Sequence, residues 1–328
     1  PVENIKEVRA IKVLKVDAYW DEPLAGAEYL LEFVEADNSR TEVATGTTDA
    51  DGVLQFDNLP DGEYVLTEIN APEGYLLDAT EHPITMVSNR TEPFVVELEN
   101  DRDPDYFGDL LIQKVDDTDP EIRLKGAEFK LERIAYGGGR EVVDTGVTDD
   151  SGEIRFDNLF FGDYILTETK APDGYWPNTT GRTVTVYPKN GSPDPVTVTE
   201  IVEVENKKDL GSIRVVKVDR DTNAPLEGAT FKLEFVEADN SRTEKHIGTT
   251  KATGELTFEG LVPGTYILTE TVSPEGYIDN PTEREVIVPK FSTADVVVPV
   301  ENIKEVRAIK VLKVDADSDE PLAGAEYL

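Results

Sequence analysis

The 328-residue sequence contains three copies of one pattern, and this repetition limits the fold more than any other feature. Each copy opens with an alternating apolar and polar run that ends in Lys-Val-Asp. It continues with Leu-x-Gly-Ala, a Tyr-x-Leu-Thr-Glu run and a Pro-x-Gly-Tyr turn, and it closes on Glu-Asn. Short alternating runs separated by Gly, Pro, Asn and Asp are typical of β-strands and tight turns. The sequence therefore predicts an all-β fold of tandem β-sandwich domains in an elongated array.

The copies also define the expected domain boundaries. Residues 299–328 repeat residues 1–30 except that Tyr19 and Trp20 become Asp317 and Ser318. We therefore expect the chain to be a piece of a longer array, which could continue as a fibre. The predicted segments are the end of a preceding repeat (1–4), repeat one (5–100), a linker (101–107), repeat two (108–206), a linker (207–210), repeat three (211–302) and the start of a truncated fourth repeat (303–328).

Charge and composition exclude several classes of protein. The formal net charge is -36, so no basic surface is expected for nucleic acid or for anionic membranes. The sequence has no cysteine, so a covalent brace would need other side chains. Neither a membrane-spanning apolar run nor a metal site is predicted, and no cofactor is expected.

Three polar positions recur in every copy and are the candidate site residues. They are a Lys in the first strand, a Glu in the middle strand and an Asn in the last strand. The three sets are Lys15/Glu68/Asn100, Lys114/Glu168/Asn206 and Lys217/Glu270/Asn302.

The strand pattern turns the Lys and the Glu of each set towards the core. Lys15 shares a face with Ile11 and Val13, and Glu68 shares a face with Leu66, because alternate residues of a strand face the same side. Burial lowers the pKa of a Lys and raises that of a Glu. A neutral amine can then attack an Asn side chain while the Glu moves protons, leaving an amide cross-link. The alternative is a buried ion pair beside a strand-ending Asn, but the threefold recurrence favours the cross-link.

The motifs resemble the B-type, prealbumin-like domains of Gram-positive collagen adhesins and pilins. The middle-strand signature Tyr-x-Leu-x-Glu-x-x-Ala-Pro-x-Gly-Tyr stands at residues 64–75, 164–175 and 266–277, with Ser273 replacing the Ala in the third. This resemblance implies a Greek-key sandwich, a cell-wall location and a self-formed Lys–Asn isopeptide bond promoted by the Glu. The implied protein is a structural stalk that performs no catalysis beyond this single-turnover reaction.

Two alternatives remain open from the residues. Tyr187 to Asn190 is similar to the pilin motif in which a sortase joins the Lys to the next subunit, so Lys189 would serve a pilus backbone. A ligand-binding adhesin is the other alternative. Asn4 and Lys313 match Asn302 and Lys15 and are expected to lack partners within their own repeats. Expected partners are neighbouring repeats, fibre contacts and a host ligand at a tip domain.

Overall fold

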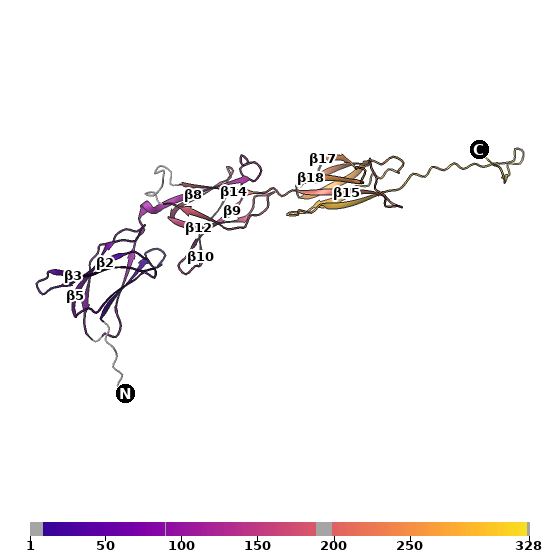
Figure 1. The fold of residues 1–328 in the computed structure, drawn as a ribbon. Helices are drawn as coiled ribbons and strands as arrows, with labels where there is room; N and C mark the ends of the chain where they lie inside the picture. Colours follow the sequence, from indigo (N-terminus) through magenta and orange to yellow (C-terminus); the bar gives the residue numbers. More distant parts are fainter. Residues whose placement is uncertain (1–8, 89, 188–198, 327–328) are drawn as a thin grey trace, which may run out of the picture. The chain divides into compact units, whose positions relative to one another are not determined.

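The computed structural model describes residues 9–88, 90–187 and 199–326 (Figure 1). Within these residues, each repeat contains seven strands, and the one helical element is the short 3-10 turn η1 (Pro104–Tyr106). No helix in the described residues is long and apolar enough to cross a membrane. The first-repeat strands are β1 (Ala10–Asp17), β2 (Glu28–Val34), β3 (Arg40–Thr47), β4 (Val53–Asp57), β5 (Gly62–Asn70), β6 (His82–Met86) and β7 (Phe94–Asn100).

The second and third repeats contain the same succession of strands. The second-repeat strands are β8 (Phe107–Asp116), β9 (Glu128–Ile134), β10 (Arg140–Val147), β11 (Glu153–Phe160), β12 (Gly162–Lys170), β13 (Arg182–Val186) and β14 (Thr199–Asn206). The third-repeat strands are β15 (Gly211–Asp219), β16 (Thr230–Val236), β17 (Arg242–Thr249), β18 (Glu255–Leu261), β19 (Gly264–Val272), β20 (Arg284–Val288) and β21 (Val296–Asn302).

Each repeat folds into two facing sheets, so the all-β sandwich prediction is confirmed. In the first repeat one sheet has the order β4-β1-β7 and the other the order β3-β2-β5-β6. The other two repeats have the same two orders in their own strands. The first and last strands of each repeat are parallel neighbours, and Asp17 pairs with Asn100 in the first. The chain therefore returns at the end of each repeat to the strand with which that repeat began.

Alternation of side chains decides which residues fill the space between the sheets. Ile11, Val13, Tyr29, Leu31 and Leu66 are 0% exposed in the first repeat and belong to one apolar cluster. The second and third repeats have equivalent clusters of their own. Burying these apolar side chains supplies the main favourable free energy for each sandwich.

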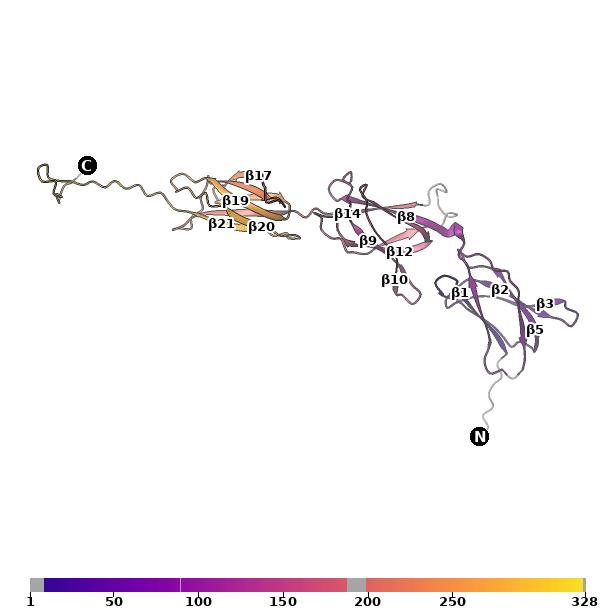
Figure 2. The ribbon, with the colours of Figure 1, turned by 180° about the vertical axis from the view of Figure 1, so that it is seen from behind.

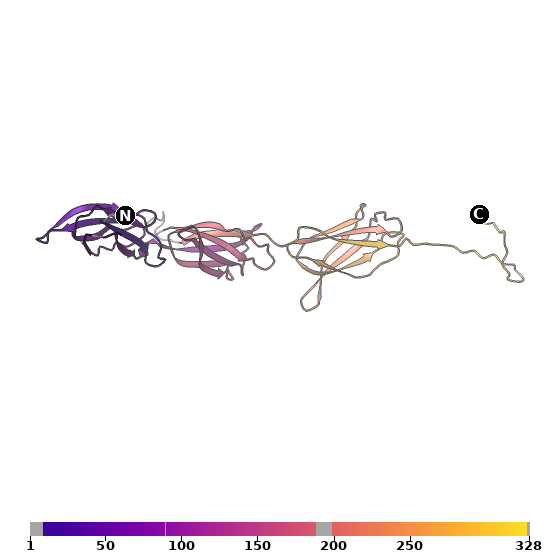
Figure 3. The same cartoon turned by 90° about the horizontal axis from the view of Figure 1, so that it is seen from below.

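The described residues form two compact units, residues 1–207 and 208–328. The first unit contains two repeats and the second contains the third repeat with the residues that follow it (Figure 2). Residues 303–305 still contact the turn at residues 276–278, and residues 306–326 then leave the third sandwich without joining either of its sheets (Figure 3). No described strand pairs with residues 306–313, although they alternate as β1 does. In the first repeat the partners of this sequence are β4 and β7, which come much later in the chain.

Candidate functional site

Each sandwich buries the lysine of its first strand. Lys15 follows Ile11 and Val13 on the core face of β1 and is 1% exposed. Lys114 on β8 and Lys217 on β15 are 0% exposed. A buried ammonium group costs several kcal/mol unless a partner compensates its lost hydration. Each of the three cores therefore contains a lysine whose burial is unfavourable unless a partner compensates it.

A glutamate of the facing sheet lies opposite each lysine. The three carboxylates come from β5, β12 and β19, and their residues are 2–3% exposed. The Nζ–Oε distances are 3.4 Å for Lys15–Glu68, 3.9 Å for Lys114–Glu168 and 3.1 Å for Lys217–Glu270. The amine and the carboxylate thus meet between the sheets in every repeat.

The closing asparagine completes each set. Its Nδ2 donates to the Glu carboxylate, and the shortest Nδ2–Oε distances are 2.9 Å in Asn100–Glu68, 2.9 Å in Asn206–Glu168 and 3.0 Å in Asn302–Glu270. These asparagines are 1–3% exposed. Each lies at the end of a last strand that is the parallel neighbour of the strand that carries the lysine. The structure therefore brings together all nine residues that the sequence assigned to the three sets.

The third set has the most direct contact between lysine and asparagine. Lys217 Nζ donates to Asn302 Oδ1 as well as to Glu270. In the first two repeats, Nζ instead donates to a backbone oxygen, that of Glu99 at 2.9 Å or Val204 at 2.7 Å. The side-chain oxygens of Asn100 and Asn206 accept no hydrogen bond from the described residues. Their carbonyl groups are therefore left without the protein hydrogen bond that Asn302 has.

Burial makes the three amines easier to deprotonate. Burial lowers the pKa of Lys15 and of Lys217, and the nearby glutamates only partly oppose this. For Lys114 the same cause lowers the pKa to about 8. The apolar surroundings include the ring of Phe231, whose centre lies 5.9 Å from Lys217 Nζ. A larger fraction of each amine is therefore neutral, and hence nucleophilic, than in water.

Of the three other candidate residues, the structure describes only Lys313. Lys313 is exposed and lies in the segment that joins no sheet. Asn4 and Lys189 lie outside the described residues, so their proposed roles in a neighbouring repeat and in sortase linkage stay predictions.

Two further polar positions recur in all three repeats but were not among the predicted site residues. One is the Asp of Lys-Val-Asp, and the other is the last Tyr of the Pro-x-Gly-Tyr turn. In the first repeat the Tyr75 hydroxyl donates to Asp17 Oδ2 at 2.7 Å. Their recurrence was the signal that could have found them. Their separation by 58 residues hid the contact between them.

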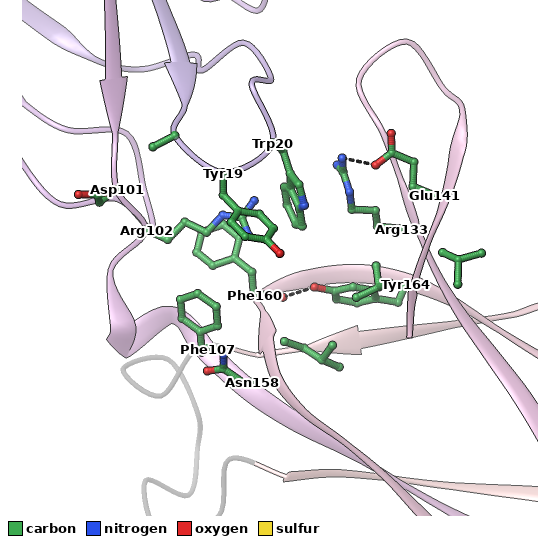
Figure 4. Close-up of a pocket in the computed structure, with 14 residues that line it drawn as sticks. Tyr19, Trp20, Asp101, Arg102, Phe107, Arg133, Glu141, Asn158, Phe160 and Tyr164 are labelled. Atoms are coloured by element: carbon green, nitrogen blue, oxygen red, sulfur yellow. Dashed lines mark hydrogen bonds and ion pairs between the residues drawn. The ribbon is translucent and has the colours of Figure 1, made fainter. Parts of the chain in front are cut away.

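A second cluster joins the two repeats of the first unit (Figure 4). Trp20 lies at its centre, and the guanidinium carbons of Arg102 and Arg133 lie 3.3 Å and 3.8 Å from the centre of the Trp20 ring. Arg102 also forms an ion pair with the buried Asp17 at 2.8 Å. Arg133, from the second repeat, forms one with Glu22 of the first at 2.7 Å.

A pocket of about 650 Å³ opens beside this cluster and is lined by Trp20, Arg102, Arg133 and Phe160 (Figure 4). Both arginines are already paired with carboxylates of the chain. Arg102 pairs with Asp17, and Arg133 pairs with Glu22 and, at 2.5 Å, with Glu141. We therefore interpret the cluster as a joint between the two repeats, and we call it the Trp20 joint.

Comparison with known proteins identifies the fold of the repeats. The sequence profile of the SpaA prealbumin-like fold domain matches residues 9–102, 108–201 and 211–302. The solved structure of the Bacillus anthracis TIE protein is similar, with a TM-score of 0.51 and 30% identity, and the match covers 91% of this chain and 52% of that one.

Two curated proteins illustrate the sequence similarity. The collagen adhesin of Staphylococcus aureus is 27% identical over an alignment of 198 residues, and the match covers 53% of this chain and 16% of the adhesin. The fimbrial subunit type 2 of Actinomyces naeslundii is 33% identical over an alignment of 136 residues, and the match covers 31% of this chain and 24% of the subunit. The chain therefore spans less than a quarter of the length of either relative.

Proposed function

Because the chain belongs to the family of SpaA prealbumin-like fold domains, we propose that it is part of a structural stalk on the surface of a Gram-positive bacterium. Tandem sandwiches, an acidic composition and similarity to an adhesin and a fimbrial subunit support this proposal. A stalk needs resistance to force rather than a ligand pocket, and the Lys, Glu and Asn that recur in these repeats lie inside their cores.

We further propose that each repeat is closed by a self-formed isopeptide bond between its buried Lys and Asn. The neutral Lys Nζ attacks Asn Cγ, so a C–N bond forms and the bond from Cγ to Nδ2 breaks. The Glu carries the proton lost by Nζ to Nδ2, which leaves as ammonia. The reaction consumes no external reagent, and its product is one amide and one ammonia.

The surroundings of each set favour this reaction. The core holds the amine, the amide and the acid next to one another. The groups therefore need no diffusional encounter and react at a high effective concentration. Burial supplies the neutral amine, and Nδ2 already donates to the carboxylate that would protonate it. The contact from Lys217 Nζ to both Glu270 and Asn302 is the observation that carries the proposal.

The mass of the folded chain tests the proposal. Three bonds make the chain lighter than its sequence by three ammonias, and proteolytic peptides should contain Lys15 joined to Asn100, Lys114 to Asn206 and Lys217 to Asn302. A chain with the unmodified mass would show that the sets are buried ion pairs only.

The proposal of a stalk requires a separate test, because a cross-linked domain could also serve a pilus backbone or a ligand-binding adhesin. Immunogold labelling of intact cells with antibody against these repeats should mark the zone between the wall and the outermost part of the surface layer. Label on long polymers linked through Lys189 would favour the pilus backbone instead.

A further inference from the structure

The turn that follows each middle strand accepts a hydrogen bond from the Asn of the set, and in the first two repeats it also donates one to the Glu. In the first repeat the backbone oxygen of Leu76 accepts a hydrogen bond from Asn100 Nδ2. Two residues later, the backbone N–H of Asp78 donates to Glu68 Oε2 at 2.9 Å. One short stretch of backbone therefore holds the amide nitrogen that would leave and the carboxylate that would protonate it.

The second repeat has both contacts, and the third has the contact with the Asn. In the second, Asn206 Nδ2 donates to the backbone oxygen of Trp176 at 2.9 Å, and the N–H of Asn178 donates to Glu168 at 2.8 Å. In the third, Asn302 Nδ2 donates to the backbone oxygen of Ile278 at 3.2 Å. With its two hydrogens directed at two acceptors, the amide has a fixed plane and presents its carbon in one direction.

The turn is itself tied to the first strand by the Asp and Tyr that recur in all repeats. We call this pair the Asp–Tyr latch. The distances from the Tyr hydroxyl to Asp Oδ2 are 2.7 Å for Tyr75–Asp17, 2.9 Å for Tyr175–Asp116 and 2.8 Å for Tyr277–Asp219. The Tyr immediately precedes the residue whose backbone oxygen accepts from the Asn.

The Asp end of the latch is held firmly. Asp219 follows Lys217 by two residues on β15 and pairs with Asn302 in the strand ladder. Its Oδ1 accepts the backbone N–H groups of Asp221 and Thr222. The hydroxyl of Tyr277 and the backbone of Thr222 lower the pKa of Asp219 to about 2, so the carboxylate stays ionised and the hydrogen bond is charge-assisted.

We propose that the Asp–Tyr latch is a positioning element for the cross-linking reaction, because it fixes the turn that orients the Asn amide in every repeat and the Glu carboxylate in the first two. This inference rests on the proposed isopeptide chemistry. Neither latch residue touches the reacting bond in this role. Loss of the latch should lower the rate of bond formation in its own repeat while leaving the sandwich folded.

The third repeat offers a matched pair of variants for the test. Tyr277→Phe removes the latch hydroxyl. Tyr266→Phe removes another hydroxyl of the same repeat, which donates to the backbone oxygen of Val262 at 2.9 Å. Full-length chains are made by cell-free synthesis, quenched at intervals and digested, and the joined peptides of all three repeats are quantified by mass spectrometry. Near-ultraviolet circular dichroism of each variant establishes that it is folded.

The expected result is a selective delay. In Tyr277→Phe, the Lys217–Asn302 bond should form more slowly by on the order of tenfold to a hundredfold, as for a misplaced reacting group. The bonds of the first two repeats and all bonds of Tyr266→Phe should form at the parent rate. Asp219→Asn, which keeps an acceptor for Tyr277, should be faster than Asp219→Ala.

Two outcomes would overturn the latch and leave the isopeptide proposal intact. One is parental kinetics in Tyr277→Phe, and the other is an equal delay in Tyr277→Phe and Tyr266→Phe, which would indicate a general loss of stability. A parent chain without any joined peptide would overturn both proposals.

Discussion

Lys217 and Glu270 face each other inside the third sandwich, with 3.1 Å between Nζ and Oε2 and neither residue more than 3% exposed. The pair comes from different sheets, β15 and β19, so the contact exists only when the sandwich is closed. A reaction that needs this contact can therefore take place only in the folded repeat.

Replacing one glutamate should remove one bond only. Glu68→Gln keeps the shape of the side chain but leaves no group to move the proton, so the chain should be lighter than its sequence by two ammonias. Glu63→Gln is the matched control, since Glu63 lies on the same strand but is exposed, and it should keep all three bonds. Intact-mass measurement distinguishes the two variants, and three bonds in Glu68→Gln would contradict the role assigned to the carboxylate.

A chain that is unable to close its second bond should become more stable as the pH rises. In Asn206→Ala the buried Lys114 remains, with a folded-state pKa of about 8 against an ordinary value of 10.5. Between these values the unfolded state binds more protons, so the free energy of unfolding increases with pH. Below pH 8, Lys114 is protonated in both the folded and the unfolded state, so the destabilisation caused by its buried charge is fully present.

The double variant Asn206→Ala/Lys114→Met isolates the contribution of this amine. Groups that titrate elsewhere affect both chains alike, so the difference between their unfolding free energies should change with pH across this window. Urea titrations at several pH values provide the measurement. A difference that is independent of pH would show that Lys114 keeps an ordinary pKa in the fold.

Pulling the ends of the chain should not extend the residues between a linked Lys and Asn. In the first repeat the two residues lie on the parallel neighbours β1 and β7, so force that enters at one strand and leaves at the other passes through the bond. Residues 16–99 are then protected from extension. In Glu68→Gln they should extend by about 290 Å in a single step, given roughly 3.4 Å per residue. Optical-trap traces in which the parent chain also shows this step would refute the bond as a force path.

Removing Trp20 should loosen the joint between the first two repeats. Stacking of Arg102 and Arg133 on this ring contributes about 0.5–2 kcal/mol for each contact. Because the chain has no cysteine, single cysteines placed at the exposed Val43 and Val147 can carry spin labels. The distance distribution between these labels should broaden in Trp20→Ala and stay unchanged in Trp176→Ala. Equal distributions in both variants would contradict the Trp20 joint.

Much of each sandwich was predictable because its signals are local. Ile11, Val13 and Lys15 occupy alternate positions of one strand, so the two apolar residues indicate that Lys15 also faces the core. Leu66 indicates the same for Glu68. Recurrence in three copies then separated the Lys, Glu and Asn from polar residues that vary. Residues 306–313 alternate in the same way but form no strand, since alternation alone supplies no neighbouring strand to pair with.

Other features depended on contacts that a local pattern does not encode. The recurrence of Asp17 and Tyr75 is visible in the sequence, but their hydrogen bond forms only when the turn folds back onto the end of β1. Trp20 gave no sign of its role because its partner Arg133 belongs to the next repeat. Neither contact follows from the side that a residue faces within its own strand.

The sequence by itself determined the number of repeats, the strand character of each, the inward-facing Lys and Glu and the recurring Asn, because these follow from periodicity and repetition. Only the tertiary structure decided that the last strand lies parallel to the first, and hence that Asn100 Nδ2 lies 2.9 Å from Glu68 Oε2 while Glu68 Oε1 lies 3.4 Å from Lys15 Nζ. The physical reason is that alternation fixes the face of a side chain, whereas the choice of neighbouring strand is made by the packing of the whole sandwich.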